Sequence, residues 1–540
     1  MQKLLLLGDE AIAQAGIDAG MSGIYAYPGT PSTEITEYVR TSREAREKGI
    51  VASWCANEKT AAETALGMSY AGKRTMTCMK HVGLNVAADA FINSSITGAN
   101  GGIIFVVADD PSMHSSQNEQ DSRFFGKFAM IPVLEPSNQQ EAYDMVHYGF
   151  DISEKYKIPV MIRITTRLAH SRAGVARRES RAQNQTGLPE NLRQFVLLPA
   201  IARKQYQDLL NNQENFHRES ETAGHNQYLP GEDKSMGIIA CGLAYNYLME
   251  NYPDRKVPHP VLKITQYPVP QKMVEQLYDE CDSIMVIEDG YPLVEDMLKG
   301  LLNKGKTIRG RLDGSLPRTG ELNPNHVGVA LGFDKSYGQD IPNLVASRPP
   351  SLCKGCPHID SFLGLNEVLE TYGRGRVFSD IGCYTLSALP PYESINTCVD
   401  MGASITMAKG AADAGLTPAI AVIGDSTFTH SGITGLLDAV NEKSNITVII
   451  LDNATTGMTG GQPSSAYGKI EDICKGIGVD EEHIRVLKPL RKNHDENVAI
   501  LREELEYNGV SVIIPRRECI VTLNKRMRDK FKEKAKTAGN

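Results

Sequence analysis

Short, continuous apolar runs alternate along the chain with segments whose apolar residues recur at helical spacing. A strand that is apolar on both faces belongs in a sheet that helices cover on both sides. Several runs end in Asp, Gly or Asn, where a doubly wound sheet places its ligand-binding crevice. The runs occupy residues 103–110, 159–167, 235–242, 283–290, 419–425, 446–453 and 510–515. The pattern predicts an α/β protein built on mostly parallel, doubly wound sheets, and the leucines at 4–7 predict a buried first strand.

Polar, irregular stretches divide this pattern into parts. At 540 residues the chain is too long for one hydrophobic core. Residues 176–235 are polar, and residues 306–350 are rich in Gly, Pro and Asn, so both stretches are predicted to be linkers. We therefore predict three α/β domains, at residues 1–175, 236–305 and 351–540.

Composition narrows the class of protein. The chain is 41% hydrophobic and 23% charged, as globular proteins commonly are. Its net charge of −8 gives no support to nucleic-acid binding. No apolar run approaches the roughly 20 residues that a membrane-spanning helix needs. We expect a cytoplasmic protein whose ten cysteines are thiols, metal ligands or redox groups rather than disulfides.

The stretch GDSTFTHSGITGLLDAVNEKSNITVIILDNATTGMTGGQ at 424–462 carries the most specific chemistry. Two apolar strands flank a helix whose predicted apolar face is Ile433, Leu436, Leu437 and Val440.

Neighbouring parallel strands would bring Asp425 and Asn453 to one edge of a sheet, where Gly424 permits a close backbone approach. A carboxylate and an amide oxygen suit Mg²⁺, which keeps phosphate ligands as well. The alternative is that Asp425 caps a helix and Asn453 makes a turn. The gap of 26 residues between Ser426 and Asn453, with TGGQ after it, favours a diphosphate site.

At this point the chain resembles a family, the 2-oxoacid:ferredoxin oxidoreductases, and within it the large subunit of the indolepyruvate enzymes. Gly-Asp, the 26-residue gap and Asn resemble the thiamine diphosphate motif. The resemblance covers nearly the whole chain in the expected order. Its other motifs are YPGTPSTEI (27–35), NEKTAAETALGMSYAG (57–72), MKHVGLNVAADAF (79–91), HSSQNEQDSR (114–123), LCKGCPHIDSF (352–362), DIGCYTL (380–386) and DNATTGMTGGQ (452–462).

The resemblance implies roles for residues in the second half of the chain. Residues 351–540 would be the diphosphate-binding domain, and 236–305 a transketolase C-terminal-like domain. Asp425, Asn453 and the carbonyl of Thr455 would hold Mg²⁺ and, through it, the diphosphate. Three further residues would line the cofactor site: Ser426, Met458 and Gly460. Met458 stands where pyruvate-type relatives have Asn, and an adaptable thioether fits an aryl 2-oxoacid better than pyruvate.

In the first half, the resemblance implies a pyrimidine-binding domain at 1–175. Glu58 would hydrogen-bond the aminopyrimidine ring and promote proton removal from the thiazolium. Thr30 would lie near the substrate carboxylate or the cofactor. By themselves Glu58 is equally a helix-start acid and Thr30 a turn residue. His81 and His430 lie in motif loops and are candidate donors or proton-transfer groups, although a loop histidine is more often structural.

The cysteines give a second line of inference. Cys353 and Cys356, in CKGC, are compatible with half of a zinc site, a redox pair or two iron–sulfur ligands. No second C-x-x-C pair follows, and the single cysteines Cys383 and Cys519 come later. In pyruvate-type relatives these four places hold a [4Fe-4S] cluster, and the resemblance implies one here. The remaining cysteines belong to no such pattern and are interpreted as core or surface thiols: Cys55, Cys78, Cys241, Cys281, Cys398 and Cys474.

The chain departs from the family in one respect. The large subunit of the indolepyruvate enzymes usually continues into a ferredoxin-like domain with two further cysteine runs, whereas no cysteine follows Cys519 here. We therefore expect the electrons to leave through a separate ferredoxin or a partner redox subunit, and we expect the small (beta) subunit as a separate polypeptide in a hetero-oligomer.

The resemblance implies oxidative decarboxylation of an aryl 2-oxoacid to an acyl-coenzyme A. The first alternative is a non-redox thiamine-dependent decarboxylase or carboligase, which needs Glu58, Asp425 and Asn453 but not the four cysteines. The second is a non-catalytic scaffold subunit, which the intact motifs disfavour.

Overall fold

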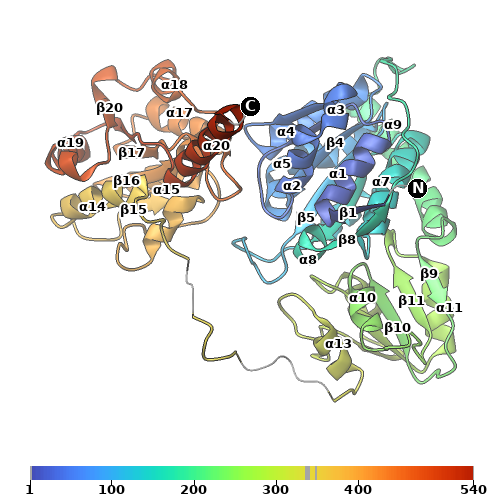
Figure 1. The fold of residues 1–540 in the computed structure, drawn as a ribbon. Helices are drawn as coiled ribbons and strands as arrows, with labels where there is room; N and C mark the ends of the chain where they lie inside the picture. Colours follow the sequence, from blue (N-terminus) through green and yellow to red (C-terminus); the bar gives the residue numbers. More distant parts are fainter. Residues whose placement is uncertain (1–2, 335–340, 347–349, 539–540) are drawn as a thin grey trace. The chain divides into compact units, whose positions relative to one another are not determined.

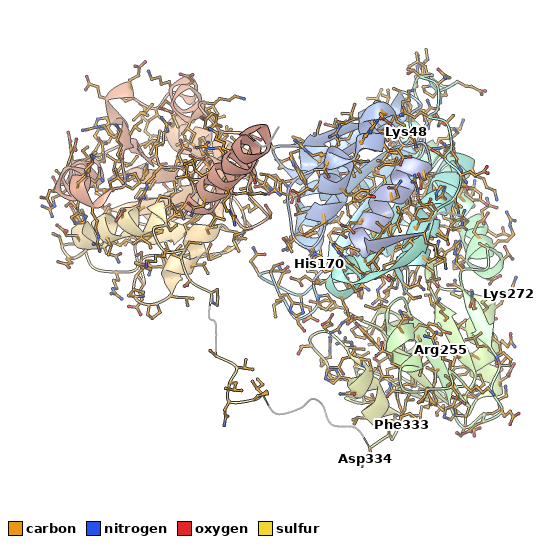
Figure 2. All side chains as sticks on the ribbon, viewed as in Figure 1. Lys48, His170, Arg255, Lys272, Phe333 and Asp334 are labelled. Carbon is orange, nitrogen blue, oxygen red and sulfur yellow. The ribbon has the colours of Figure 1, made fainter. Side chains whose placement is uncertain are left out.

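The computed structural model describes residues 3–334, 341–346 and 350–538, with side chains as far as residue 530. The chain forms two compact units, Met1–Ile341 and Pro342–Asn540, and each is described by itself (Figure 1). Side chains fill the space between the ribbons within each unit (Figure 2). Among the described residues, none of the helices combines the length and the apolar character needed to cross a bilayer.

A seven-stranded sheet forms the centre of the first unit, with the strand order β12-β6-β7-β5-β4-β2-β3. All neighbours are parallel except β12, which runs antiparallel to β6. The strands are β2 (Gly23–Ala26), β3 (Val51–Trp54), β4 (Thr75–Lys80), β5 (Ile103–Asp109), β6 (Val133–Leu134), β7 (Val160–Thr165) and β12 (Gln266–Tyr267). Its helices are α1 (Gly8–Asp18), α2 (Thr33–Thr41), α3 (Arg43–Glu47), α4 (Glu58–Tyr70), α5 (His81–Thr97), α6 (Arg123–Ala129), α7 (Gln139–Tyr156) and α8 (Thr166–His170).

Helices cover both faces of this sheet, as the continuous apolar runs predict. Strand β5 shows how: Ile104 and Val106 belong to the core that contains α1 and α7, whereas Phe105 and Val107 belong to the core that contains α4 and α5. The two helix pairs lie on opposite sides of the sheet in Figure 1. Because successive side chains on a strand point to opposite faces, a strand covered twice has no polar face.

The leucine run at 4–7 forms the predicted strand, but the prediction that it is buried is wrong. Strand β1 (Lys3–Leu7) pairs only with β8 (Arg172–Ala176), in a separate two-stranded sheet. Leu6 is buried, whereas Leu5 is 68% exposed. A two-stranded ribbon on the outside of the helices buries one face only, so alternate leucines contact solvent.

A second sheet completes the first unit, with the order β14-β13-β10-β11-β9 and only β9 antiparallel. Its strands are β9 (Gln227–Leu229), β10 (Gly237–Cys241), β11 (Val261–Ile264), β13 (Ser283–Ile287) and β14 (Thr307–Arg309). The accompanying helices are α9 (Pro199–Thr222), α10 (Ala244–Met249), α11 (Gln271–Glu280), α12 (Leu293–Lys299) and α13 (Pro324–Ala330).

Regular elements also occupy parts of the two predicted linkers. Helix α9 lies within residues 176–235, and β14 and α13 lie within residues 306–350. Helix α9 has 24 residues, of which only Leu209, Phe216 and Ser220 are buried. Most of the other positions of the helix are not buried, which explains why its sequence is largely polar. The functional division into domains at the expected boundaries stays a prediction.

A network of buried ion pairs joins the two sheets of the first unit. Arg123 and Arg163 are both 1% exposed. Arg163 pairs with Asp109 of β5 (Nε–Oδ2 2.7 Å) and with Glu135. Arg123 pairs with Glu288, the residue after β13 (Nη1–Oε2 3.0 Å). Buried charges require such partners, because an unpaired ion in the interior is costly.

The second unit contains a five-stranded, wholly parallel sheet with the order β15-β16-β17-β21-β20. The strands are β15 (Val377–Ser379), β16 (Ala419–Gly424), β17 (Ile446–Leu451), β20 (Ile484–Leu487) and β21 (Val510–Pro515), and a separate two-residue pair is β18 (Thr455–Thr456) with β19 (Gln462–Pro463). The α-helices are α14 (Pro357–Leu369), α15 (Ala403–Asp413), α16 (Asp425–Thr427), α17 (Ile433–Asn441), α18 (Ile470–Ile477), α19 (His494–Glu506) and α20 (Ile520–Ala538). Short helical turns are η1 (Cys383–Ala388), η2 (Phe428–Gly432, a π-turn), η3 (Glu481–His483) and η4 (Arg491–Asn493).

Helix α17 forms where the apolar spacing predicts it, although its buried face is partly different. Leu436 is buried, but Leu437 is 42% exposed. The helix instead buries Gly435 and Ala439 beside Leu436. Small residues let it approach α15 closely: a Cβ at Gly435 would lie 3.0 Å from Thr406 Cγ2. The spacing rule counts only large apolar residues and therefore misplaces the face.

Candidate active site

The strand pair predicted from the stretch at 424–462 is present. β16 and β17 are parallel neighbours, with Gly424 paired to Leu451 at their carboxyl ends. Asp425 begins α16 directly after β16, and Asn453 follows β17 by two residues. The carboxyl ends of parallel strands share one edge of a sheet, so both side chains belong to that edge.

Asp425 is a buried acid whose hydrogen bonding is incomplete. Its side chain is 2% exposed, and Oδ2 is buried without a hydrogen-bond partner. Burial raises the pKa of Asp425 to about 7, and the charge of Asp452 adds to the shift. Buried polar atoms are normally satisfied, and an exception calls for an explanation. A cation at Oδ2 would supply the missing partner.

Asn453 begins a tightly bonded loop. Its Oδ1 accepts from the backbone N–H of Thr455 (3.1 Å), and Nδ2 lies 3.3 Å from His358 Nε2. Between them Ala454 has φ +63°, a conformation that L residues rarely adopt. The hydroxyl of Thr455 donates to the carbonyl of Gln462 (2.9 Å), which closes the loop on itself. An amide oxygen has two lone pairs, so Oδ1 can accept this hydrogen bond and also bind a cation.

The other predicted cofactor residues lie on this loop or next to it. The hydroxyls of Ser426 and Thr456 are hydrogen bonded (2.8 Å). A Cβ at Gly424 would lie 2.7 Å from the ring of Tyr384, which explains the glycine by packing. Gly460 has φ +113° and permits the turn. Met458 is 57% exposed on the same loop. Their roles towards a cofactor stay predictions.

The four motif cysteines lie close enough to affect one another. Burial raises the pKa of Cys383 to about 12, and the negative charges of Cys356, Cys519 and Cys353 add to the shift. The N–H of Cys356 donates to the carbonyl of Cys353 (2.9 Å) in a turn. Within the described part of the chain, no three thiol sulfurs lie within 4.8 Å of one another. A cubane cluster separates its ligands more widely than a single ion does, so this spacing is compatible with a cluster but not with a zinc ion bound as the thiols now lie.

These cysteines also adjoin the loop after β17. The N–H of Cys519 donates to the carbonyl of Asn453 (3.1 Å). A Cβ at Gly457 would lie 2.8 Å from Cys383 Sγ. The loop that contains the predicted cation ligands Asn453 and Thr455 therefore also contacts two of the predicted cluster cysteines.

In the first unit, Glu58 begins α4 and is 4% exposed. Asn57 caps this helix, since its side chain accepts from the N–H of Thr60 (2.8 Å). A Cβ at Gly83 of α5 would lie 2.6 Å from Glu58 Oε1, so the glycine lets α5 approach the carboxylate. Glu58 is thus both a helix-start acid and a positioned buried carboxylate.

Thr30 and His81 lie at the carboxyl edge of the first sheet. The carbonyl of Thr30 accepts from the hydroxyl of Ser115 (3.2 Å). His81 begins α5 and is 1% exposed; its Nε2 lies 3.2 Å from the carbonyl of Asn118, and Nδ1 is buried without a hydrogen-bond partner. One ring nitrogen of His81 is therefore left without a partner among the described residues.

Lys80 is a residue that the sequence analysis missed. Its ammonium donates to the carbonyl of Ser115 (2.9 Å), the residue whose hydroxyl contacts Thr30. Burial lowers the pKa of Lys80 to about 8, against the opposing effect of the charges of Asp110 and Glu58. Lys80 lies within the motif at 79–91, but a single lysine there has no pattern of its own.

Three further buried residues of the second unit were also overlooked or left open. His358, from the CKGCPH motif, contacts Asn453, and burial lowers the pKa of His358 to about 4. Asp380, the first residue of the DIGC motif, accepts from Tyr384 and from the hydroxyl of Ser404 (2.7 Å). His430 is 3% exposed in η2, with Nδ1 2.7 Å from Ser431 Oγ.

Two family profiles match the two units separately. The profile described as pyruvate flavodoxin/ferredoxin oxidoreductase, thiamine diphosphate-binding, matches residues 14–217. The profile of the thiamine pyrophosphate enzyme C-terminal binding domain matches residues 380–514. Glu58 falls within the first match, and Asp425, Asn453 and Cys383 within the second.

Matches to whole chains decide the family. The indolepyruvate oxidoreductase subunit IorA of Archaeoglobus fulgidus is 40% identical over 96% of this chain and 87% of its own. The chain belongs to the indolepyruvate oxidoreductase IorA family. The IorA subunit of Pyrococcus abyssi is 38% identical over 96% of this chain and 86% of its own. A solved 2-oxoglutarate:ferredoxin oxidoreductase from Magnetococcus marinus covers 61% of this chain and 65% of its own, with a TM-score of 0.49 and 16% identity, too slight a likeness to support an argument.

Membership of the IorA family confirms the predicted resemblance, fold class and enzyme class. The chain is a catalytic subunit of a thiamine diphosphate-dependent 2-oxoacid oxidoreductase. The residues at the site fit that cofactor, because Asp425 Oδ2 lacks a partner and Asn453 offers an amide oxygen beside it in the sheet edge. The relatives are named as one subunit of an oxidoreductase.

Proposed function

We propose that the chain catalyses oxidative decarboxylation of an aryl 2-oxoacid of the indolepyruvate type to an acyl-coenzyme A. Four cysteines of the chain would hold a [4Fe-4S] cluster, which would supply one-electron transfer towards ferredoxin or a partner redox subunit. The observation that carries the proposal is the shared loop after β17, which contacts the candidate cation ligands and Cys383 alike. A redox thiamine enzyme needs these two sites close together, whereas a simple decarboxylase needs only the first.

Asp425, Asn453 and the carbonyl of Thr455 hold Mg²⁺, which binds the diphosphate. The buried Oδ2 of Asp425, which has no hydrogen-bond partner, supports this assignment. Oxygen ligands of this kind suit a hard divalent cation that keeps phosphate oxygens in its shell. When bound, thiamine diphosphate supplies the electron sink for loss of CO₂ from the substrate.

Glu58 holds the proton that the cofactor ring must exchange. Burial in the first turn of α4, with α5 brought close at Gly83, fixes the carboxylate in place. A positioned general acid–base group of this kind contributes about 10²–10⁴-fold to rate.

Lys80, Thr30 and His81 bind the substrate. A 2-oxoacid carries a carboxylate, and the Lys80 ammonium is a half-buried cation linked through Ser115 to Thr30. The unpartnered Nδ1 of His81, when it carries a proton, donates a hydrogen bond to the substrate carboxylate. Met458 provides an apolar, adaptable surface for an aryl side chain.

The thiolates of Cys353, Cys356, Cys383 and Cys519 hold the cluster. Each of these thiols contributes to the electrostatic environment of Cys383, which supports their grouping. The partners are then the small subunit, coenzyme A, and ferredoxin or another redox protein.

The experiment compares two activities in anaerobically prepared enzyme. With indolepyruvate or phenylpyruvate and coenzyme A, wild type should release CO₂ and reduce a viologen dye, and it should contain about four irons per chain. Cys356→Ser should lose iron and dye reduction. Cys474→Ser, at a buried cysteine outside the set, should lose neither.

Two results would contradict the proposal. Iron-free protein from strictly anaerobic cells that still decarboxylates the substrate would identify a non-redox thiamine decarboxylase. Activity with pyruvate that matches or exceeds activity with the aryl substrates would overturn the substrate class.

A further inference from the structure

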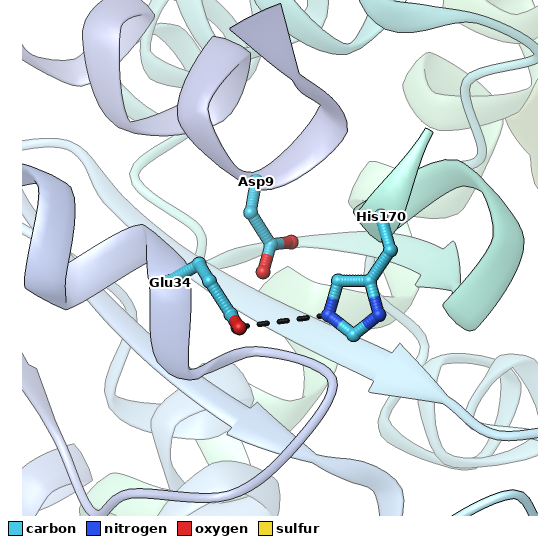
Figure 3. Close-up of side chains that lie close together, drawn as sticks. All are labelled: Asp9, Glu34 and His170. Atoms are coloured by element: carbon cyan, nitrogen blue, oxygen red, sulfur yellow. Dashed lines mark ion pairs between the residues drawn. The ribbon is translucent and has the colours of Figure 1, made fainter. Parts of the chain in front are cut away.

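Three side chains from separate helices meet on the first unit, and none of them has been assigned a role above. Asp9 belongs to the first turn of α1, Glu34 to the first turn of α2, and His170 is the last residue of α8. One potential ligand atom from each lies within 4.8 Å of the other two. Figure 3 shows the Asp9 carboxylate directed into the space between Glu34 and His170.

Asp9 is the unusual member of this group. Its side chain is fully buried, and neither Oδ1 nor Oδ2 has a hydrogen-bond partner. Burial raises the pKa of Asp9 well above the usual value, and the charges of Glu34 and Glu10 add to the shift. An ionised carboxylate buried without donors costs several kcal/mol unless a cation or a proton compensates it.

Glu34 and His170 form the outer side of the group. Glu34 Oε2 lies 3.6 Å from His170 Nε2, and the two side chains are 38% and 35% exposed. Each shifts the other: the contact with His170 lowers the pKa of Glu34, and the same contact raises the pKa of His170. Glu34 Oε2 itself has no hydrogen-bond partner at ordinary distance. The group is thus closed by Asp9 on the inside and open to solvent at the other two residues.

We propose that Asp9, Glu34 and His170 together bind one divalent first-row transition cation, such as Zn²⁺ or Mn²⁺. The donor set is one imidazole nitrogen with two carboxylates. Imidazole favours Zn²⁺ and similar ions over Mg²⁺ and Ca²⁺, which take oxygen ligands, and water completes the coordination. This cation is distinct from the Mg²⁺ assigned to Asp425, because the two proposed sites have no ligand residue in common.

The cation would cross-link three elements that the sheets do not join directly. α2 begins at Thr33, immediately after the loop that carries Thr30, and α8 leads into β8. Binding would therefore hold the entrance to α2 in place and stabilise the folded first unit. Any ion that binds the folded state and not the unfolded one raises stability by mass action.

The competing occupant is a proton. A protonated Asp9 could share its hydrogen with Glu34 and leave the group without a metal. The two possibilities differ in what they predict, because a proton leaves stability independent of added metal, whereas a bound cation does not.

The test uses the full-length, anaerobically prepared chain with saturating Mg²⁺ and thiamine diphosphate, titrated with Co²⁺ as a spectroscopic probe. Wild type should bind one Co²⁺ per chain at this site, with visible bands of a nitrogen–oxygen site and without the intense near-ultraviolet absorption of cobalt thiolates. His170→Gln should weaken this Co²⁺ binding at least 30-fold. The matched control is His494→Gln, which removes a histidine paired with Glu367 (2.7 Å) but without a third ligand, and it should bind as wild type does.

Thermal unfolding gives a second, independent measurement. Zn²⁺ or Mn²⁺ should raise the Tm of wild type but not of Asp9→Asn. Without metal, Asp9→Asn should be at least as stable as wild type, because a neutral amide replaces an acid that has no partner. A Tm of wild type that does not respond to any of these ions, or equal Co²⁺ binding by wild type and His170→Gln, would overturn the metal site and assign the proton to Asp9.

Discussion

Asp121 in the first unit and Asp425 in the second are equally buried but differ in their surroundings. Burial by itself raises the pKa of Asp121, but the charges of Arg123 and Arg163 outweigh it and bring the pKa down to about 2. Asp425 has no such cation, and its pKa is raised to about 7. Arg123 Nη2 lies 2.5 Å from Asp121 Oδ2, whereas Asp425 Oδ2 has no hydrogen-bond partner.

The difference distinguishes two uses of a buried acid. Asp121 has its counter-ion within the chain and serves to hold two sheets together. Asp425 has no such counter-ion, so its carboxylate can bind a cation that carries a ligand. By the same criterion Asp9, with two unpartnered oxygens, resembles Asp425 rather than Asp121. The four predictions that follow test whether the counter-ion is what separates these classes.

The largest effect is expected from removing the internal cation. Arg123→Met should lower the free energy of unfolding by about 3–5 kcal/mol, because it leaves Glu288 buried without its cation and leaves Asp121 with only the more distant Arg163 (Nη2–Oδ2 3.7 Å). Chemical denaturation measures the change. Arg178→Met, which breaks a partly exposed pair with Asp144, is the control and should cost no more than about 1 kcal/mol. An equal loss of unfolding free energy in the two variants would show that the buried ion pair is no more important than the exposed one.

Asp380 offers a test through pH. Burial raises the pKa of Asp380 to about 7 from 3.8, so the folded chain holds its proton more tightly than the unfolded chain. The resulting stability is fully present below about pH 4 and is lost as pH rises through about 7. Wild type should thus lose an amount on the order of 2–4 kcal/mol across this range that Asp380→Asn does not lose. Parallel pH slopes for the two proteins in denaturant titrations would contradict this.

The third prediction concerns the acid without a counter-ion. Asp425→Ala should weaken binding of thiamine diphosphate with Mg²⁺ by at least about 100-fold, because the diphosphate loses a ligand of its bridging cation. Calorimetric titration of the cofactor measures the loss. Asp438→Ala, an exposed acid on α17, should bind as wild type does. Unchanged affinity in Asp425→Ala would show that the site is misassigned.

The smallest effect is expected at Lys80. Its pKa of about 8 means that the ammonium loses its proton as pH rises through that value. KM for the 2-oxoacid should therefore rise above pH 8 in wild type, and Lys80→Met should raise KM by about tenfold at lower pH with a smaller change in kcat, since one charged contact contributes about 1.5–3 kcal/mol. Lys59→Met, at a lysine paired with Glu63 on the surface, should leave KM unchanged. A Lys80→Met enzyme with normal KM would exclude Lys80 from substrate binding.

Local sequence pattern was sufficient for most of the fold. Strand β21 lies at 510–515 as predicted, and β16 and β17 are the predicted parallel neighbours. The exceptions have a common cause. β1 is only half buried and α9 is largely polar, because burial depends on what each element packs against, and that partner is distant in the sequence.

The sequence by itself determined the fold class, the strand-end positions of Asp425 and Asn453, and the family, because these depend on local periodicity and on motif spacing. Only the tertiary structure decided which buried acids have a counter-ion, that Lys80 contacts the Thr30 loop through Ser115, and that Asp9 meets Glu34 and His170. Whether a charge is compensated depends on neighbours from other elements and on the exclusion of water around them. Neither is encoded at any fixed spacing along the chain.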